Sequence, residues 1–178
     1  MPHIKLNNDL PGIVGLMEYR PQTGKALRGL AQTLLVENSS LTRGERELIA
    51  SYVSWLNDCE FCCRSHSAVA SALLNGDKSI VQKVKEDFES SSVSPKMKAL
   101  LEIAKQVQKK ALGVSPEMVA RARATGATDQ CIHDTVLVAA AFCMFNRYVD
   151  GLATFAPKEE QAYDAMGMRL KDHGYLNV

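Results

Sequence analysis

Residues 42–76 read TRGERELIASYVSWLNDCEFCCRSHSAVASALLNG. The stretch opens with Thr42 and Glu45 at the spacing of a capping box, in which a hydroxyl and a carboxylate satisfy free backbone donors at a helix start. Apolar residues follow at helical spacing, and Asp58 can cap a second helix just before the cysteine cluster. The Asn-Gly pair at the end of the stretch is a typical helix stop. The stretch therefore predicts two consecutive helices that form a hairpin.

The chain on either side of the hairpin carries further helix signals. Ser94 and Ser115 each precede a proline, an arrangement that favours a helix start, and Asp129 can cap a long helix that is apolar on most faces. The helix that begins near Ser94 is expected to end at about Ala111. No stretch shows the sustained two-residue alternation of a strand. We therefore expect an all-α bundle of about six to eight helices.

The first residues differ in character from the rest of the chain. Residues 1–22 contain prolines and glycines at a spacing that disfavours a regular helix. We predict an extended N-terminal arm over residues 1–22, followed by a single helical domain over residues 23–178 with the helical hairpin at about 42–75. A chain of 178 residues with 46% hydrophobic content is long enough to bury one core.

Charge and hydropathy exclude several classes of partner. The chain has 21 Lys and Arg against 20 Asp and Glu, so its net charge of +1 provides no broad field for attracting nucleic acid. No run approaches the roughly 18 apolar residues that a membrane span requires. The first residues do not have the pattern of a secretory signal. We expect a cytoplasmic protein with no nucleic-acid or membrane partner.

The cysteines point to chemistry rather than to a disulfide framework. An odd number of clustered cysteines in a cytosolic chain favours redox or metal chemistry. On a helix, Cys59, Cys62 and His66 share one face, whereas Cys63 is turned by about 100° and is expected to be a bystander. The five cysteines are Cys59, Cys62, Cys63, Cys131 and Cys143.

The three residues on that face suit peroxide reduction. Free N–H groups at a helix start favour a thiolate, so we expect lowered pKa values for the thiols of Cys59 and Cys62. A thiolate attacks a peroxide bond to give a sulfenic acid, which a second thiol captures as a disulfide. His66 is a candidate acid and base for the proton transfers. Glu47 is a carboxylate beside an apolar run, a position at which a charged group usually has a partner.

Other interpretations of the same residues remain open. Cys59, Cys62, His66 and Glu47 could instead hold a structural zinc ion, because zinc accepts sulfur, nitrogen and oxygen in tetrahedral geometry. The lack of a second cysteine pair argues against this, and we expect no metal and no cofactor. Cys131 and Cys143 lie on a mainly apolar helix and are expected to pack in the core.

Taken together, Glu47 and the motif Cys59-x-x-Cys62-x-x-x-His66 resemble the signature of the alkylhydroperoxidase D-like, peroxidase-related branch of the carboxymuconolactone decarboxylase superfamily. The resemblance implies a peroxidatic Cys62, a resolving Cys59, and a proton relay through Glu47 and His66. It also implies an external dithiol or thioredoxin-like electron donor and helical homo-oligomers, commonly dimers, trimers or hexamers. Phe61 departs from members that have His or Tyr at its position, so no relay passes through it.

We therefore expect a thiol-dependent peroxidase that reduces hydrogen peroxide or organic hydroperoxides. Two alternatives stay open at this point. One is a non-catalytic, redox-responsive assembly protein whose disulfide changes its subunit contacts. The other is an enzyme similar to carboxymuconolactone decarboxylase, which acts on a lactone without a cysteine pair.

Overall fold

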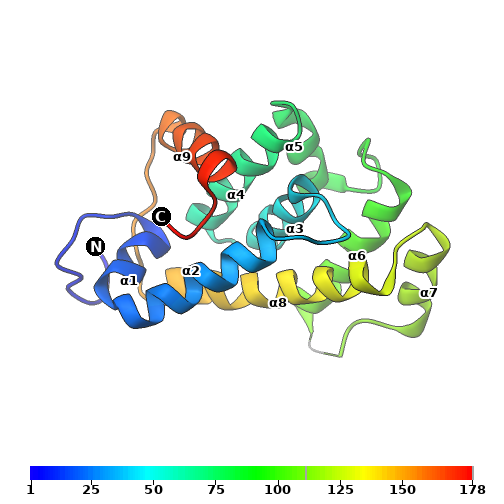
Figure 1. The fold of residues 1–178 in the computed structure, drawn as a ribbon, viewed down its shortest axis with the longest axis horizontal. Helices are drawn as coiled ribbons and strands as arrows, with labels where there is room; N and C mark the ends of the chain where they lie inside the picture. The colour runs from blue at the N-terminus through cyan, green and yellow to red at the C-terminus, as the bar shows by residue number, and fades with distance from the viewer. Residues whose placement is uncertain (111, 178) are drawn as a thin grey trace.

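Figure 1 shows the computed structural model, which describes residues 1–110 and 112–177. Within these residues the regular structure is entirely helical, so the predicted all-α class is confirmed. Ala111, the predicted end of one helix, lies outside the described residues. The described part has nine helices, more than the six to eight expected: α1 (Gly12–Tyr19), α2 (Pro21–Leu35), α3 (Arg43–Leu56), α4 (Glu60–Leu73), α5 (Lys78–Asp87), α6 (Pro95–Lys109), α7 (Pro116–Ala124), α8 (Asp129–Gly151) and α9 (Glu160–His173).

The N-terminal segment accounts for part of the excess. An extended arm over residues 1–22 was expected, but α1 occupies Gly12–Tyr19 and α2 begins at Pro21. Gly12 has a φ of +54°, and this left-handed conformation turns the chain into α1. Pro21 is the first residue of α2, where its missing N–H costs least. Glycine and proline, which suggested an extended arm, therefore each start a helix here.

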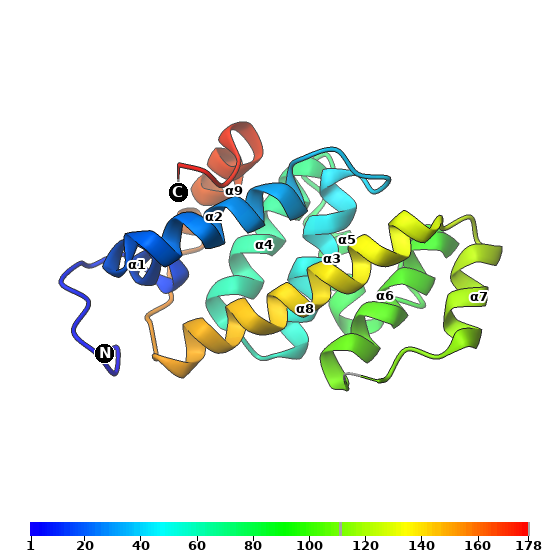
Figure 2. The same cartoon turned by 60° about the horizontal axis from the view of Figure 1, so that its bottom comes forward.

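The long helix α8 runs along the molecule and contacts α1, α2, α3, α6 and α7 (Figures 1 and 2). Its buried residues Val138, Phe142, Phe145 and Val149 recur every three or four positions and form one apolar stripe. The N-cap of α8 is Thr128, whose hydroxyl accepts from the Cys131 N–H, rather than the predicted Asp129. None of the described helices is long and apolar enough to cross a membrane.

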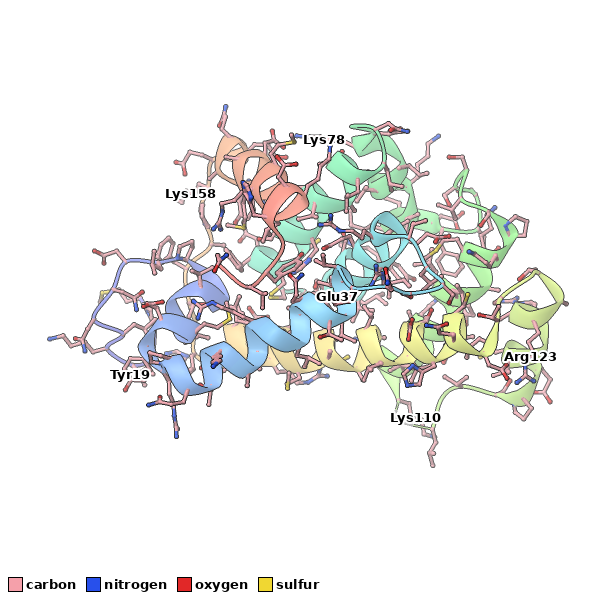
Figure 3. All side chains as sticks on the ribbon, in the orientation of Figure 1. Tyr19, Glu37, Lys78, Lys110, Arg123 and Lys158 are labelled. Atoms are coloured by element: carbon pink, nitrogen blue, oxygen red, sulfur yellow. The ribbon has the colours of Figure 1, made fainter. Side chains whose placement is uncertain are left out.

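Helix α9 packs closely on α4 and returns the chain toward α2. A Cβ atom at Gly167 would lie 2.9 Å from the Ala68 backbone, so only glycine allows this close approach. Lys78, labelled in Figure 3, joins α5 to α9 through an ion pair of 2.7 Å with Asp164. After α9, the Tyr175 N–H donates to the Gln32 side chain of α2. The residues that follow α9 are therefore anchored to α2.

Candidate active site

The α3–α4 hairpin provides the framework of the site. The predicted capping box of α3 is present, because the Thr42 side chain accepts from the Glu45 N–H and the Glu45 carboxylate accepts from the Thr42 N–H. The predicted cap of α4 is wrong. Asp58 has a φ of +57° and forms part of the turn, and Cys59 is the N-cap residue. This tight turn brings the buried face of α3 against the cysteine face of α4.

Glu47 and His66 meet across the hairpin. Glu47 Oε2 lies 2.7 Å from His66 Nδ1, and the Glu47 side chain is 1% exposed. A carboxylate only accepts hydrogen bonds, so Nδ1 is the donor, and Nε2 is left as the acceptor of the imidazole. This tautomer directs a proton-accepting nitrogen away from the carboxylate. His66 also lies edge-on to Phe142 with ring centroids 4.6 Å apart, which restricts the orientation of its ring.

Tyr175 completes this group and was not predicted from the sequence. Its hydroxyl donates to Glu47 Oε1 at 2.5 Å and lies 3.4 Å from His66 Nδ1, while its ring stacks on the imidazole. Burial and the charge of Glu47 raise the pKa of Tyr175 well above its usual value, so the phenol keeps its proton. Glu47 therefore receives two hydrogen bonds, one through each oxygen. In the neighbouring sequence, the only signal for this position of Tyr175 is Gly174, which ends α9 and turns the chain back.

The two motif cysteines lie together in a second small cluster. Cys59 and Cys62 are buried with Phe61, Val149 and Tyr163. The pKa of Cys59 is raised, first by its hydrogen bond with Cys62 and second by burial. The prediction of a lowered pKa is therefore wrong for Cys59, because the cost of burial and the neighbouring sulfur outweigh the helix start. Cys59 therefore remains a thiol, which can donate a hydrogen bond to Cys62.

The other three cysteines lie elsewhere, and all five are free. Cys63 is half-buried, and burial raises its pKa, whereas the neighbouring Lys85 and Ser67 oppose this shift. Cys131 is buried in the main core, as predicted. Cys143 is half-buried and packs against the same core.

A small cavity opens beside Cys62. Its volume is about 60 Å³ and most of its lining is apolar. Cys62, Ser65 and His66 face it from α4, since residues three and four apart share a helix face. Helices α1, α2, α8 and α9 close the remaining sides through Ile13, Val14, Met17, Leu27, Arg28, Ala31, Phe142, Phe145, Met166 and Leu170. The thiol thus borders a largely apolar space, with the imidazole at the same wall.

The zinc alternative requires ligands that converge on a point. Among the residues that the structure describes, no group of three or more His, Cys, Asp and Glu side chains is arranged to hold a metal ion. Glu47 instead pairs with His66 and Tyr175, and Cys59 pairs with Cys62.

Comparison with known protein families supports the resemblance that the motif suggested. Residues 21–79, which contain Glu47, Cys59, Cys62 and His66, match the model of the Carboxymuconolactone decarboxylase family. The matched segment is about a third of the chain. The match supports the superfamily resemblance inferred from the motif, and the matched segment spans α2, α3 and α4. Tyr175, α8 and α9 lie outside it.

Two solved structures share the fold of this chain. One is described as an alkylhydroperoxidase AhpD core, an uncharacterized peroxidase-related protein from Ralstonia eutropha JMP134. It is 23% identical, with a TM-score of 0.79, and the match covers 89% of this chain and 81% of that one. The other is an uncharacterized peroxidase-related protein from Silicibacter sp. TM1040, 22% identical, with a TM-score of 0.78 and coverage of 88% and 80%. No curated protein matches the chain.

Proposed function

We propose that this protein is a thiol-dependent peroxidase in which Cys62 is the peroxidatic residue and Cys59 the resolving residue. The observation that carries the proposal is the 2.7 Å contact between Glu47 and His66 at the wall that also presents Cys62 to the cavity. An imidazole fixed in this tautomer can take the proton of the Cys62 thiol at Nε2. It can then return that proton to the departing oxygen.

The proposed catalytic cycle uses an external dithiol as its reductant. The Cys62 thiolate attacks one oxygen of a hydroperoxide ROOH, the O–O bond breaks, and the departing oxygen takes a proton to leave as ROH. The resulting Cys62 sulfenic acid reacts with the Cys59 thiol, which forms the disulfide and releases water. A dithiol or thioredoxin-like donor then reduces the disulfide by exchange and is itself oxidised.

The cavity favours small organic hydroperoxides. Its lining is mainly apolar, which suits an alkyl group better than water. Its volume of about 60 Å³ is well below the roughly 150 Å³ of an engineered apolar cavity that holds benzene. We therefore expect tert-butyl hydroperoxide to react faster than cumene hydroperoxide, whose ring needs more room.

Substitution of single cysteines tests the assignment. Purified protein is mixed with tert-butyl hydroperoxide and dithiothreitol, and peroxide loss is followed over time. Cys62→Ser should abolish consumption, because the nucleophile is removed. Cys59→Ser should allow the Cys62 sulfenic acid to accumulate, which dimedone labelling and mass spectrometry detect. Cys63→Ser is the matched control and should behave as wild type. Absence of peroxide consumption by the wild type would refute the proposal.

A second candidate, redox-responsive assembly, has support on the surface of α8. Leu137 and Met144 are 41% and 44% exposed and stand two helical turns apart, so they form an apolar strip that a second copy of the chain could cover. We propose a homo-oligomer on this basis. Size-exclusion chromatography of reduced and peroxide-oxidised samples decides whether the disulfide matters. Identical elution of the two samples would rule out redox control of assembly.

A further inference from the structure

Ser65 is a buried polar residue that the proposed cysteine chemistry does not yet use. It is 3% exposed, and its Oγ has no hydrogen-bond partner among the described residues. A buried hydroxyl without a partner is disfavoured, so such groups are rare in folded proteins. The position therefore calls for a specific explanation.

Serine and threonine hydroxyls inside helices usually bond back to a carbonyl three or four residues earlier. The buried Thr135 of α8 does so, because its Oγ1 donates to the Cys131 carbonyl at 2.7 Å. Outside the helices, the buried Ser91 in the turn after α5 likewise donates to the Phe88 carbonyl three residues earlier, at 2.7 Å. Ser65 has equivalent carbonyls within α4 but makes no such bond. Its donor is thus left for a group outside the helix backbone.

Ser65 also differs from the other buried polar atoms that lack a partner in the described part of the chain. These are Arg43 Nε, Arg46 Nε and Tyr163 Oη, none of which belongs to a residue that lines the cavity at Cys62. Ser65 lines that cavity together with Cys62 and His66. It follows Cys62 by three residues and His66 follows by four, so thiol, hydroxyl and imidazole border one end of the same space.

We infer that Ser65 is a further catalytic residue, whose hydroxyl donates a hydrogen bond to the departing oxygen of the hydroperoxide. This inference rests on the proposed peroxidase function. As the sulfur–oxygen bond forms and the O–O bond breaks, the electron pair of that bond passes to the departing oxygen. Ser65 stabilises the negative charge there and keeps its own proton. The proton that completes ROH comes from His66, which received it from Cys62.

A hydrogen-bond donor that points at developing negative charge stabilises that charge most strongly where water is excluded. The apolar lining of this cavity provides such a setting. The bound peroxide also resolves the unpartnered state of Ser65, since its oxygen supplies the missing acceptor.

The test compares Ser65→Ala with wild type in single-turnover oxidation of Cys62, using tert-butyl hydroperoxide. Removing one such donor typically slows a reaction about 10²-fold to 10³-fold when full charge develops, and we expect a loss of roughly tenfold to a hundredfold here. The loss should be smaller with peracetic acid, because its departing acetate needs less stabilisation. Alkylation of Cys62 by iodoacetamide should keep its rate, since iodide leaves without needing this donor.

Ser67→Ala is the matched control on the same helix. Its hydroxyl lies 2.7 Å from the Ser51 hydroxyl, and Ser67 does not line the cavity at Cys62. It should react with peroxide as wild type does. Ser65→Ala should unfold at the same denaturant concentration as wild type or at a higher one, because it removes a hydroxyl that has no partner.

The outcomes separate the two proposals. A peroxide rate for Ser65→Ala within twofold of an active wild type overturns the role of Ser65 and leaves the peroxidase intact. Equal losses with tert-butyl hydroperoxide, peracetic acid and iodoacetamide also overturn it, because Ser65 would then act on the thiol. A wild type that fails to react with either peroxide overturns the peroxidase proposal, and the role of Ser65 with it.

Discussion

At the scale of single residues, the buried carboxylate of Glu47 organises the candidate site. It accepts from His66 through one oxygen and from Tyr175 through the other. The two donor side chains also restrict each other's orientation, because the phenol ring stacks on the imidazole. The Glu47 side chain is 1% exposed, so water can do little to replace a lost donor. The position of the imidazole therefore depends on a residue outside the cysteine motif.

Tyr175→Phe tests this dependence. The variant keeps the ring but leaves one oxygen of a buried carboxylate without its donor, so we expect the free energy of unfolding to fall by about 1–3 kcal/mol. Peroxide reduction should slow as well, because the imidazole loses part of its support. Urea unfolding and single-turnover kinetics measure the two effects. Tyr19→Phe is the control, since Tyr19 is 48% exposed. Equal behaviour of the two variants would contradict the role given to Tyr175.

The sequence predicted some residues of the site and missed others for a physical reason. Glu47 and His66 lie on neighbouring helices joined by a short turn, so helical periodicity alone could suggest that they face each other. Tyr175 is 128 residues away from Glu47, and no local pattern encodes that contact. Ser65 is within the motif region, but its significance is the absence of a backbone bond, which only the packed structure reveals.

At the scale of elements, α1 forms part of the cover over the cysteine helix. Gly12, at its first position, lies against the Phe61 ring, where a Cβ atom would approach a ring carbon to 2.1 Å. Ile13, Val14 and Met17 of the same helix then line the cavity. The capping box of α3 was predictable because it is local in sequence. The start of α1 was not, because its glycine is selected by a contact with α4.

Gly12→Ala should loosen this cover. The added methyl group clashes with Phe61 and the residue keeps a left-handed conformation, so we expect a loss of roughly 1–3 kcal/mol in the free energy of unfolding. Cys62 should also react faster with iodoacetamide, because α1 is displaced from the cavity. Stability at or above the wild-type value would show that α1 does not depend on this contact.

Gly29→Ala provides the opposite expectation within the neighbouring helix. Gly29 lies inside α2, and no atom other than those of its chain neighbours and its own helix backbone stands within 4 Å of the position of its missing Cβ. Alanine should raise the free energy of unfolding by about 0.5–1 kcal/mol, since glycine is unfavourable in a helix interior. Chemical denaturation measures the change. A loss of stability would mean that α2 needs the freedom of glycine at this point.

At the scale of the whole molecule, the tyrosines link stability to alkaline pH. Burial raises the pKa of Tyr52 and of Tyr163 to about 12. The pKa of Tyr175 is raised well above 10. In the unfolded chain these phenols ionise near pH 10. Above that pH the folded state therefore holds more protons than the unfolded state, and stability falls as pH rises.

We expect the free energy of unfolding to decline steadily between about pH 10 and pH 12. At pH 11, three of the five tyrosines should still be mostly un-ionised in the folded protein, which tyrosinate absorbance measures directly. Urea unfolding at each pH gives the corresponding stability. Tyr175→Phe should reduce the slope of the decline, because it removes one phenol whose pKa is raised by folding. A stability that is flat up to pH 11 would contradict the burial of these hydroxyls.

The contact between Tyr175 and Glu47 has a consequence for biosynthesis. A ribosome translates Glu47 and the cysteines long before it adds Tyr175, so the nascent hairpin emerges without the phenol or the covering α9. During that interval the thiols face the surrounding solution on an incomplete scaffold. Oxidants would therefore reach the thiols of newly made chains more readily than those of mature ones.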